Sequence, residues 1–91
     1  MTAVFYAPRA IADVERLTEF LLATDRKAAA ETGEILFDAI AHHPLVGRIV
    51  EHGLRELVIS RGKTGYVALY RFDAAHDQVI VLAIRHQREL D

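Results

Sequence analysis

The side chains best suited to chemistry lie in the C-terminal half of the chain, between apolar runs that read as strands. They are basic or aromatic: Arg61, Tyr66, Tyr70, Arg71, Arg85, His86 and Arg88. Arginine forms paired hydrogen bonds with phosphate or carboxylate, tyrosine stacks on bases or packs on peptides, and histidine acts as a general acid or base. The set therefore fits a phosphate-handling site or a docking surface for an acidic partner, and solvated strand ends explain it about as well.

Several familiar kinds of active site find no match in the sequence. The chain has no cysteine, and its five histidines are scattered, with no pair at helical i, i+4 spacing beside an acidic ligand. "GKT" at residues 62–64 lies between two strand-like runs, which indicates a hairpin turn rather than a phosphate-binding loop. We expect no metal and no cofactor, and we lean towards a protein that is not an enzyme.

Length and composition predict one small globular domain over residues 1–91. The 91 residues are 52% hydrophobic and 26% charged. Residues 1–40 carry four basic and seven acidic side chains, a charge of −3, whereas residues 41–91 carry seven and six, a charge of +1. The net charge of −2 argues against bulk binding of nucleic acid. No signal peptide and no apolar run of roughly 20 residues is present, so we expect a cytoplasmic protein without a membrane partner.

Periodicity predicts a helical hairpin after a short first strand. The apolar stretch at residues 3–7 ends at Pro8, so it reads as a strand at a sheet edge, and Pro8 suits the first turn of a helix. Apolar residues then recur at spacings of three and four up to Leu22, and a second helix is expected over residues 26–42. Gly33 lies inside this second helix, where we expect it to allow the two helices to pack closely.

Three strand-like runs follow, at residues 54–60, 66–72 and 78–86. Short turns separate them, so they form an antiparallel meander, and the order β-α-α-β-β-β predicts a two-layer α+β fold. Apolar residues occupy both alternations of these strands. One set is Leu57, Ile59, Val67, Leu69, Ile80, Leu82 and Ile84, and the other is Val58, Tyr66, Ala68, Tyr70, Phe72, Val79, Val81 and Ala83. The helices can cover only one face, so we expect a partner chain to cover the other.

The order of these elements and several short motifs resemble the ParE/RelE superfamily of type II toxin–antitoxin toxins, the ParE-like branch most of all. The motifs are "HPLVGR" at 43–48, "LREL" at 54–57, "GYVALYR" at 65–71 and the terminal "IRHQRE" at 84–89. The resemblance implies a helical hairpin on an antiparallel sheet. It also implies a cognate antitoxin that wraps the toxin and through which alone the pair contacts operator DNA.

The resemblance implies two kinds of target. RelE-like members cut ribosome-bound mRNA without a metal, and ParE-like members inhibit DNA gyrase. Arg61 and Arg88 match basic positions of the ribonucleases, and His86 is the candidate base. However, "ELVIS" stands where the ribonucleases place lysines, and the late catalytic tyrosine has no counterpart. Without a good base, RNA cleavage loses a proton transfer worth roughly 10²–10⁴-fold.

We therefore expect a gyrase-binding toxin first, an endoribonuclease second, and a degenerate antitoxin-binding subunit third. An antitoxin over the second sheet face would hide Tyr66 and Tyr70, and its acidic residues would pair with Arg61, Arg71 or Arg85. On this interpretation the "IRHQREL" end of the chain is a docking edge.

Overall fold

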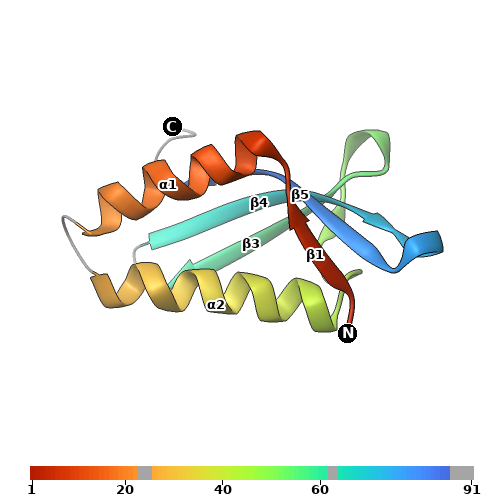
Figure 1. Cartoon of the computed structure of the whole chain (residues 1–91), viewed down its shortest axis with the longest axis horizontal. Coiled ribbons are helices and arrows are strands. Elements are labelled where there is room, and N and C mark those ends of the chain that lie inside the picture. The colour runs from red at the N-terminus through yellow and green to blue at the C-terminus, as the bar shows by residue number, and fades with distance from the viewer. Residues whose placement is uncertain (23–25, 62–63, 87–91) are drawn as a thin grey trace.

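Two helices cover one face of a five-stranded sheet (Figure 1). The computed structural model describes residues 1–22, 26–61 and 64–86. Its elements are β1 (Ala3–Tyr6), α1 (Pro8–Leu22), α2 (Arg26–His42), β2 (Arg48–Ile49), η1 (Glu51–Gly53), β3 (Arg55–Arg61), β4 (Thr64–Asp73), η2 (Ala74–His76) and β5 (Gln78–His86). The α+β class and the order of the predicted elements are confirmed, and α1 begins at Pro8 as expected. The two-residue strand β2 was not predicted, because so short a segment carries no periodic pattern.

The sheet has the order β1-β5-β4-β3-β2, and it is mixed rather than wholly antiparallel. The three long strands pair antiparallel through their short turns, as the meander required. By contrast, β1 runs parallel to β5, with Val4 opposite Val79. Parallel strands need a long connection between them. Here the connection from β1 to β5 consists of the two helices and strands β2 to β4. Edge strand β1 therefore ends beside the last strand.

A step in the register between β4 and β5 decides which side chains face the helices. Leu69 lies opposite Ala83 and Tyr70 opposite Val81, so Leu82 is an extra residue on β5. A bulge of this kind shifts the alternation of one strand by one residue. Val79 and Val81 consequently share the helix-packed face with Ile84, and all three are buried.

The predicted division of the strand residues into two faces is therefore wrong. Ile59 lies opposite Tyr66 in the β3–β4 hairpin, and both side chains face the helices. The buried core has the following members: Ala10, Leu17, Leu36, Ile40, Ile59, Tyr66, Ala68, Tyr70, Val79, Val81 and Ile84. It thus draws on both of the predicted sets.

The Tyr70 hydroxyl holds the loop that joins α2 to β2 through two hydrogen bonds. Its side chain is fully buried, and its hydroxyl donates to the Pro44 carbonyl at 2.8 Å and accepts the Gly47 N–H at 2.7 Å. A Cβ at Gly47 would lie 2.6 Å from the Tyr70 oxygen, so only glycine fits there. Arg55 adds a bond of 2.7 Å to the Gly47 carbonyl. The loop thus depends on groups of the sheet.

Replacing Tyr70 with phenylalanine is expected to lower the free energy of unfolding by about 1–3 kcal/mol. The change removes the hydroxyl that bonds to the Gly47 N–H and the Pro44 carbonyl. A buried polar group left without a hydrogen bond costs about 1–3 kcal/mol. Urea denaturation followed by circular dichroism measures the loss. An unchanged midpoint and slope would show that the loop is held by other contacts.

Candidate functional site

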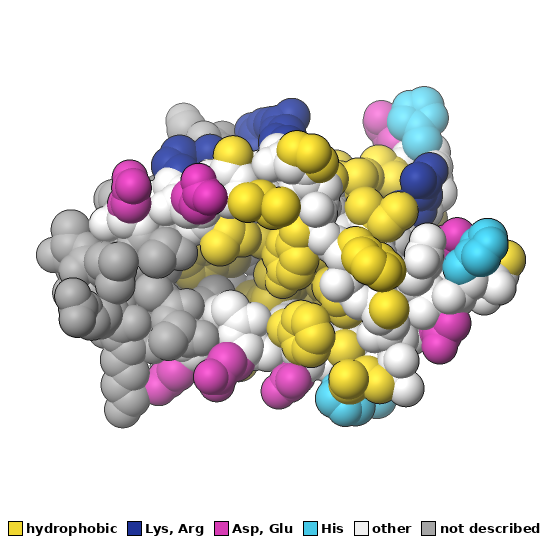
Figure 2. Space-filling model, viewed as in Figure 1, with side chains coloured by type: hydrophobic (Ala, Val, Ile, Leu, Met, Phe, Trp, Pro, Cys, Tyr) yellow, Lys and Arg dark blue, Asp and Glu magenta, His cyan; other side chains and the backbone are white. Residues whose placement is uncertain are grey.

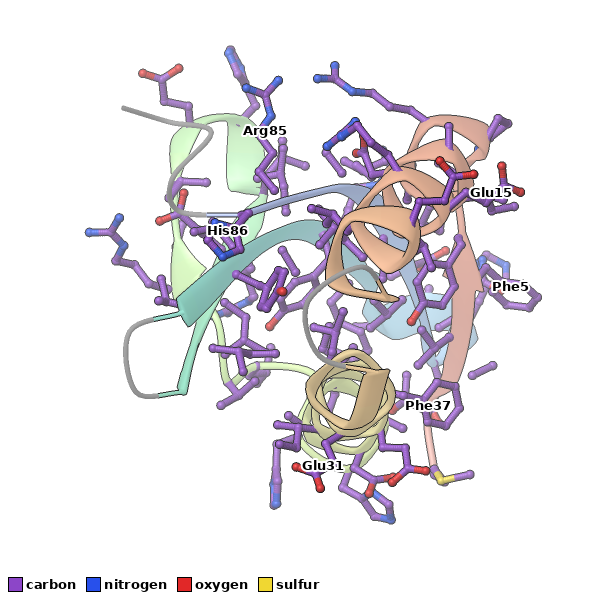
Figure 3. All side chains as sticks on the ribbon, turned by 90° about the vertical axis from the view of Figure 1, so that its left-hand side faces the viewer. Phe5, Glu15, Glu31, Phe37, Arg85 and His86 are labelled. Carbon is purple, nitrogen blue, oxygen red and sulfur yellow. The ribbon has the colours of Figure 1, made fainter. Side chains whose placement is uncertain are left out.

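Strand β5 directs Arg85 and His86 to opposite faces of the sheet (Figure 3). Arg85 is exposed and lies opposite Val67 on the face that the helices leave open. His86 is only 3% exposed on the helix-packed face, where its ring meets Tyr66 edge-on at 5.0 Å between centroids. The structure therefore separates the two polar residues that the sequence placed side by side.

The two tyrosines also lie elsewhere than expected. Tyr66 is 5% exposed and Tyr70 is 0% exposed, and both belong to the core under the helices. The expectation that they occupy the open face beneath an antitoxin is wrong, because the register sets them opposite Ile59 and Arg55 on the helix side. Tyr70 is structural, whereas Tyr66 borders a hollow between the helices.

Two of the predicted arginines cannot be placed among the others. Arg61 is the last residue of β3 and pairs with Thr64, but its side chain lies outside the described part of the structure. The described part of the structure ends at residue 86, so Arg88 lies outside it. Their roles stay predictions from the family resemblance.

The open face of the sheet combines apolar side chains with arginine. By alternation from the buried residues, its centre consists of Val58, Val67, Leu69, Ile80 and Leu82. Arg71 and Arg85 are exposed on this face, and four positions along β4 separate Arg71 from the residue opposite Arg85. That spacing is roughly 13 Å, so the pair frames an apolar strip rather than one shared anion pocket. We call this surface the arginine face.

A second surface is a groove between the two helices (Figure 2). It encloses about 560 Å³. Its lining comes from β1 (Val4, Phe5, Tyr6), α1 (Ile11, Val14, Glu15, Leu17), α2 (Gly33, Leu36) and the sheet (Ile59, Tyr66, Ala68, Ile84). The lining is almost wholly apolar. Sequence periodicity gave no sign of this groove, because it shows which helix face points inward but not how far apart two helices lie.

Large apolar side chains and acidic residues border the groove. Phe5 is 53% exposed and Phe37 39% exposed, and both lie on the same side of the molecule as Glu15 (Figure 3). Acidic side chains stand along both edges of the hollow (Figure 2); the exposed ones on the helices include Glu15, Glu19, Glu34 and Asp38. Apolar area of this kind, rimmed by charge, marks interaction sites.

Gly33 forms part of the α2 wall of the groove. A Cβ built at this position meets no atom of the described residues within 4 Å, and Gly33 is exposed. The expectation that Gly33 allows close helix packing is therefore wrong. The space beside it is open.

Neither a metal centre nor a membrane span is found in the described ranges. No group of three or more histidine, cysteine, aspartate or glutamate side chains there could hold a metal ion. Of the helices that the structure describes, none has the length and apolar character needed to cross a bilayer.

Comparison with known proteins points to one family. Residues 4–91 match the family model described as the ParE toxin of the type II toxin–antitoxin system parDE. Toxin RelE3 of Caulobacter vibrioides is 34% identical over 92 residues, which cover 98% of either chain.

Solved structures of toxin–antitoxin complexes share the fold. The RelBE2 complex of Mycobacterium tuberculosis has a TM-score of 0.69 at 24% identity, covering 94% of this chain and 98% of the other. The chromosomal ParDE system of P. aeruginosa has a TM-score of 0.66 at 19% identity, covering 92% and 94%. At these identities the structural likeness supports the fold alone.

Proposed function

Because the chain belongs to the ParE toxin family of type II toxin–antitoxin systems, we propose that it arrests growth by binding DNA gyrase without cutting RNA. A cognate antitoxin neutralises it, and operator DNA is reached only through that antitoxin. The arginine face is the surface for the target, and the groove between the helices is the surface for the antitoxin.

The position of His86 is the observation that carries the non-catalytic proposal. Cleavage of RNA at the ribose 2′-hydroxyl needs a base within hydrogen-bond reach of that group. His86 is buried against Tyr66, on the face opposite Arg71 and Arg85. A phosphate held by Arg71 or Arg85 would therefore lie across the sheet from the imidazole, and the side chains of the other two candidates, Arg61 and Arg88, lie outside the described part of the structure. This supports recognition over catalysis.

The composition of the arginine face favours a protein target. Arginine is enriched at protein–protein interfaces, which combine it with apolar residues. Here Val58 is 48% exposed at the apolar centre of the face, and Arg71 and Arg85 frame that centre. A surface that followed a nucleic-acid backbone would need a continuous basic stripe instead.

The groove is proposed as the antitoxin site because of its shape and charge. An amphipathic helix buries its apolar side in such a groove, and Phe5 and Phe37 offer exposed apolar area to meet it. The acidic borders select a helix with lysine or arginine at its flanks. Tyr66 and Tyr70 lie in the core, so the arginine face does not offer an antitoxin the two aromatic contacts that were expected there.

Replacing Arg85 with alanine is expected to reduce toxicity at least about 30-fold while antitoxin affinity changes less than about 2-fold. Truncating an arginine that acts as a hot spot of an interface costs about 2 kcal/mol or more, which is about 30-fold in affinity. The inducer concentration that halves the growth rate measures toxicity, and calorimetry measures affinity. Arg9→Ala is the matched control, since Arg9 is also exposed but lies on α1. Equal loss of toxicity and antitoxin binding would contradict separate surfaces.

Expression in cells tests the proposal as a whole. Induction should stop growth and relax plasmid supercoils while mRNA stays intact, and the small protein of the adjacent reading frame should relieve the arrest. Ribosome-dependent mRNA cleavage is the second candidate function, favoured by the 34% identity to a toxin named RelE3. Cut mRNA with normally supercoiled plasmid would establish that candidate, and normal growth would contradict both.

A further inference from the structure

Glycine at position 33 contributes neither helix stability nor closer packing against the described residues. Glycine in a helix interior is less favourable than alanine, and α2 extends well beyond Gly33 on either side. Within the part of the chain that the structure describes, a Cβ at this position would meet no atom within 4 Å. Packing against the described residues therefore does not require glycine, yet Gly33 lines the groove.

Tyr66 is the second such residue, and a different observation identifies it. Its hydroxyl is buried and has no hydrogen-bond partner among the described residues, although buried polar groups are nearly always bonded. Burial raises the pKa of Tyr66 above its ordinary value, so the phenol keeps its proton and can donate. The ring forms part of the groove floor, beside Ile59, Ala68 and Ile84. Phenylalanine would fill the same space without the cost of an unsatisfied hydroxyl.

We propose that Gly33 and Tyr66 determine which antitoxin the groove accepts. Gly33 lets the partner segment lie close to the sheet, and the partner supplies an amide or hydroxyl side chain to the Tyr66 hydroxyl. The partner group is uncharged, because the surrounding floor is apolar and a charge buried there would lose its hydration. This inference rests on the proposal that an antitoxin segment fills the groove.

A specificity role predicts effects opposite to those of a structural role. Tyr66→Phe should leave the unfolding midpoint unchanged or raised while weakening antitoxin binding about 10-fold, as loss of a buried hydrogen bond does. Gly33→Ala should raise the midpoint through helix propensity and also weaken binding. Residues that serve only the fold would instead lower stability when altered.

The test uses the full toxin and the purified protein of the adjacent reading frame. Urea denaturation gives the stability of each free variant, and calorimetry gives its affinity. Tyr70→Phe is the control for Tyr66→Phe, because the Tyr70 hydroxyl is bonded and lies outside the groove lining. It should lose stability and bind as the wild type does.

The specificity role of Gly33 and Tyr66 and the use of the groove as the antitoxin site are tested by different outcomes. If Phe37→Glu abolishes binding but Tyr66→Phe and Gly33→Ala bind as tightly as the wild type, the groove is the antitoxin site and the specificity role is overturned. If Phe37→Glu also binds as tightly as the wild type, the groove is not the antitoxin site and both proposals fail. Reduced stability of Tyr66→Phe would likewise overturn the inference, since it would assign the hydroxyl a structural bond.

Discussion

Replacing Phe37 with glutamate is expected to weaken antitoxin binding at least about 100-fold and to leave the toxin folded. Phe37 is 39% exposed and follows Leu36, which lines the groove, so part of its ring is available to a partner there. Truncation of an aromatic residue that acts as a hot spot of an interface costs about 2–4 kcal/mol. Glutamate also places a charge against an apolar partner surface, where the carboxylate would lose its hydration. Because part of the ring is covered in the free toxin, we expect the change to cost about 1–2 kcal/mol of folding stability, which is less than the total of about 5–15 kcal/mol.

Val58→Glu is the matched control for this change. Val58 is 48% exposed and also apolar, but it lies on the arginine face. Calorimetry on both variants compares the two surfaces directly. We expect Val58→Glu to bind the antitoxin within about 2-fold of the wild type. The reverse order of effects would place the antitoxin on the arginine face instead of the groove.

Replacing Asp13 with alanine is expected to lower the free energy of unfolding by about 2–3 kcal/mol. Asp13 is 5% exposed on α1, and its carboxylate accepts the Ile84 N–H of β5 at 3.0 Å and the Arg16 guanidinium at 2.8 Å. Alanine leaves the buried Ile84 N–H without its acceptor, and bonds to a charged group are worth more than neutral ones. A domain of this size has about 5–15 kcal/mol of total stability, so the loss is large.

Urea denaturation measures this loss, with Asp38→Ala as the control on an exposed face of α2. Asp13→Asn should recover part of the stability, because the amide oxygen can still accept the Ile84 N–H. If Asp13→Ala were as stable as the wild type, the attachment of α1 to β5 would depend on apolar packing alone.

Local pattern predicted the elements well, because local chemistry determines them. Apolar spacing and the position of Pro8 gave the start of α1, and the run from Gln78 to His86 gave the bounds of β5. The division of the sheet faces failed for two reasons. The β3–β4 hairpin sets Ile59 opposite Tyr66, so odd-numbered residues of β3 share a face with even-numbered residues of β4. In addition, the extra residue at Leu82 shifts the alternation within β5. No local feature of "VLAIR" reveals that shift, since it arises where β5 meets β4.

The placement of Arg85 and His86 on opposite faces of the sheet could have been predicted from the sequence. Neighbouring residues of a strand point to opposite faces, so a strand that ends at His86 cannot direct both side chains into one site. The groove and the open space at Gly33 were not within reach. They depend on the distance between α1 and α2, which the tertiary packing sets.

Purified toxin assayed in parallel on DNA gyrase and on a translating ribosome tests the central claim most directly. We expect supercoiling to stop at stoichiometric toxin, the mRNA to stay intact, and added antitoxin to restore supercoiling. Normal supercoiling together with mRNA cut at codon positions would contradict it and would make the chain a ribonuclease.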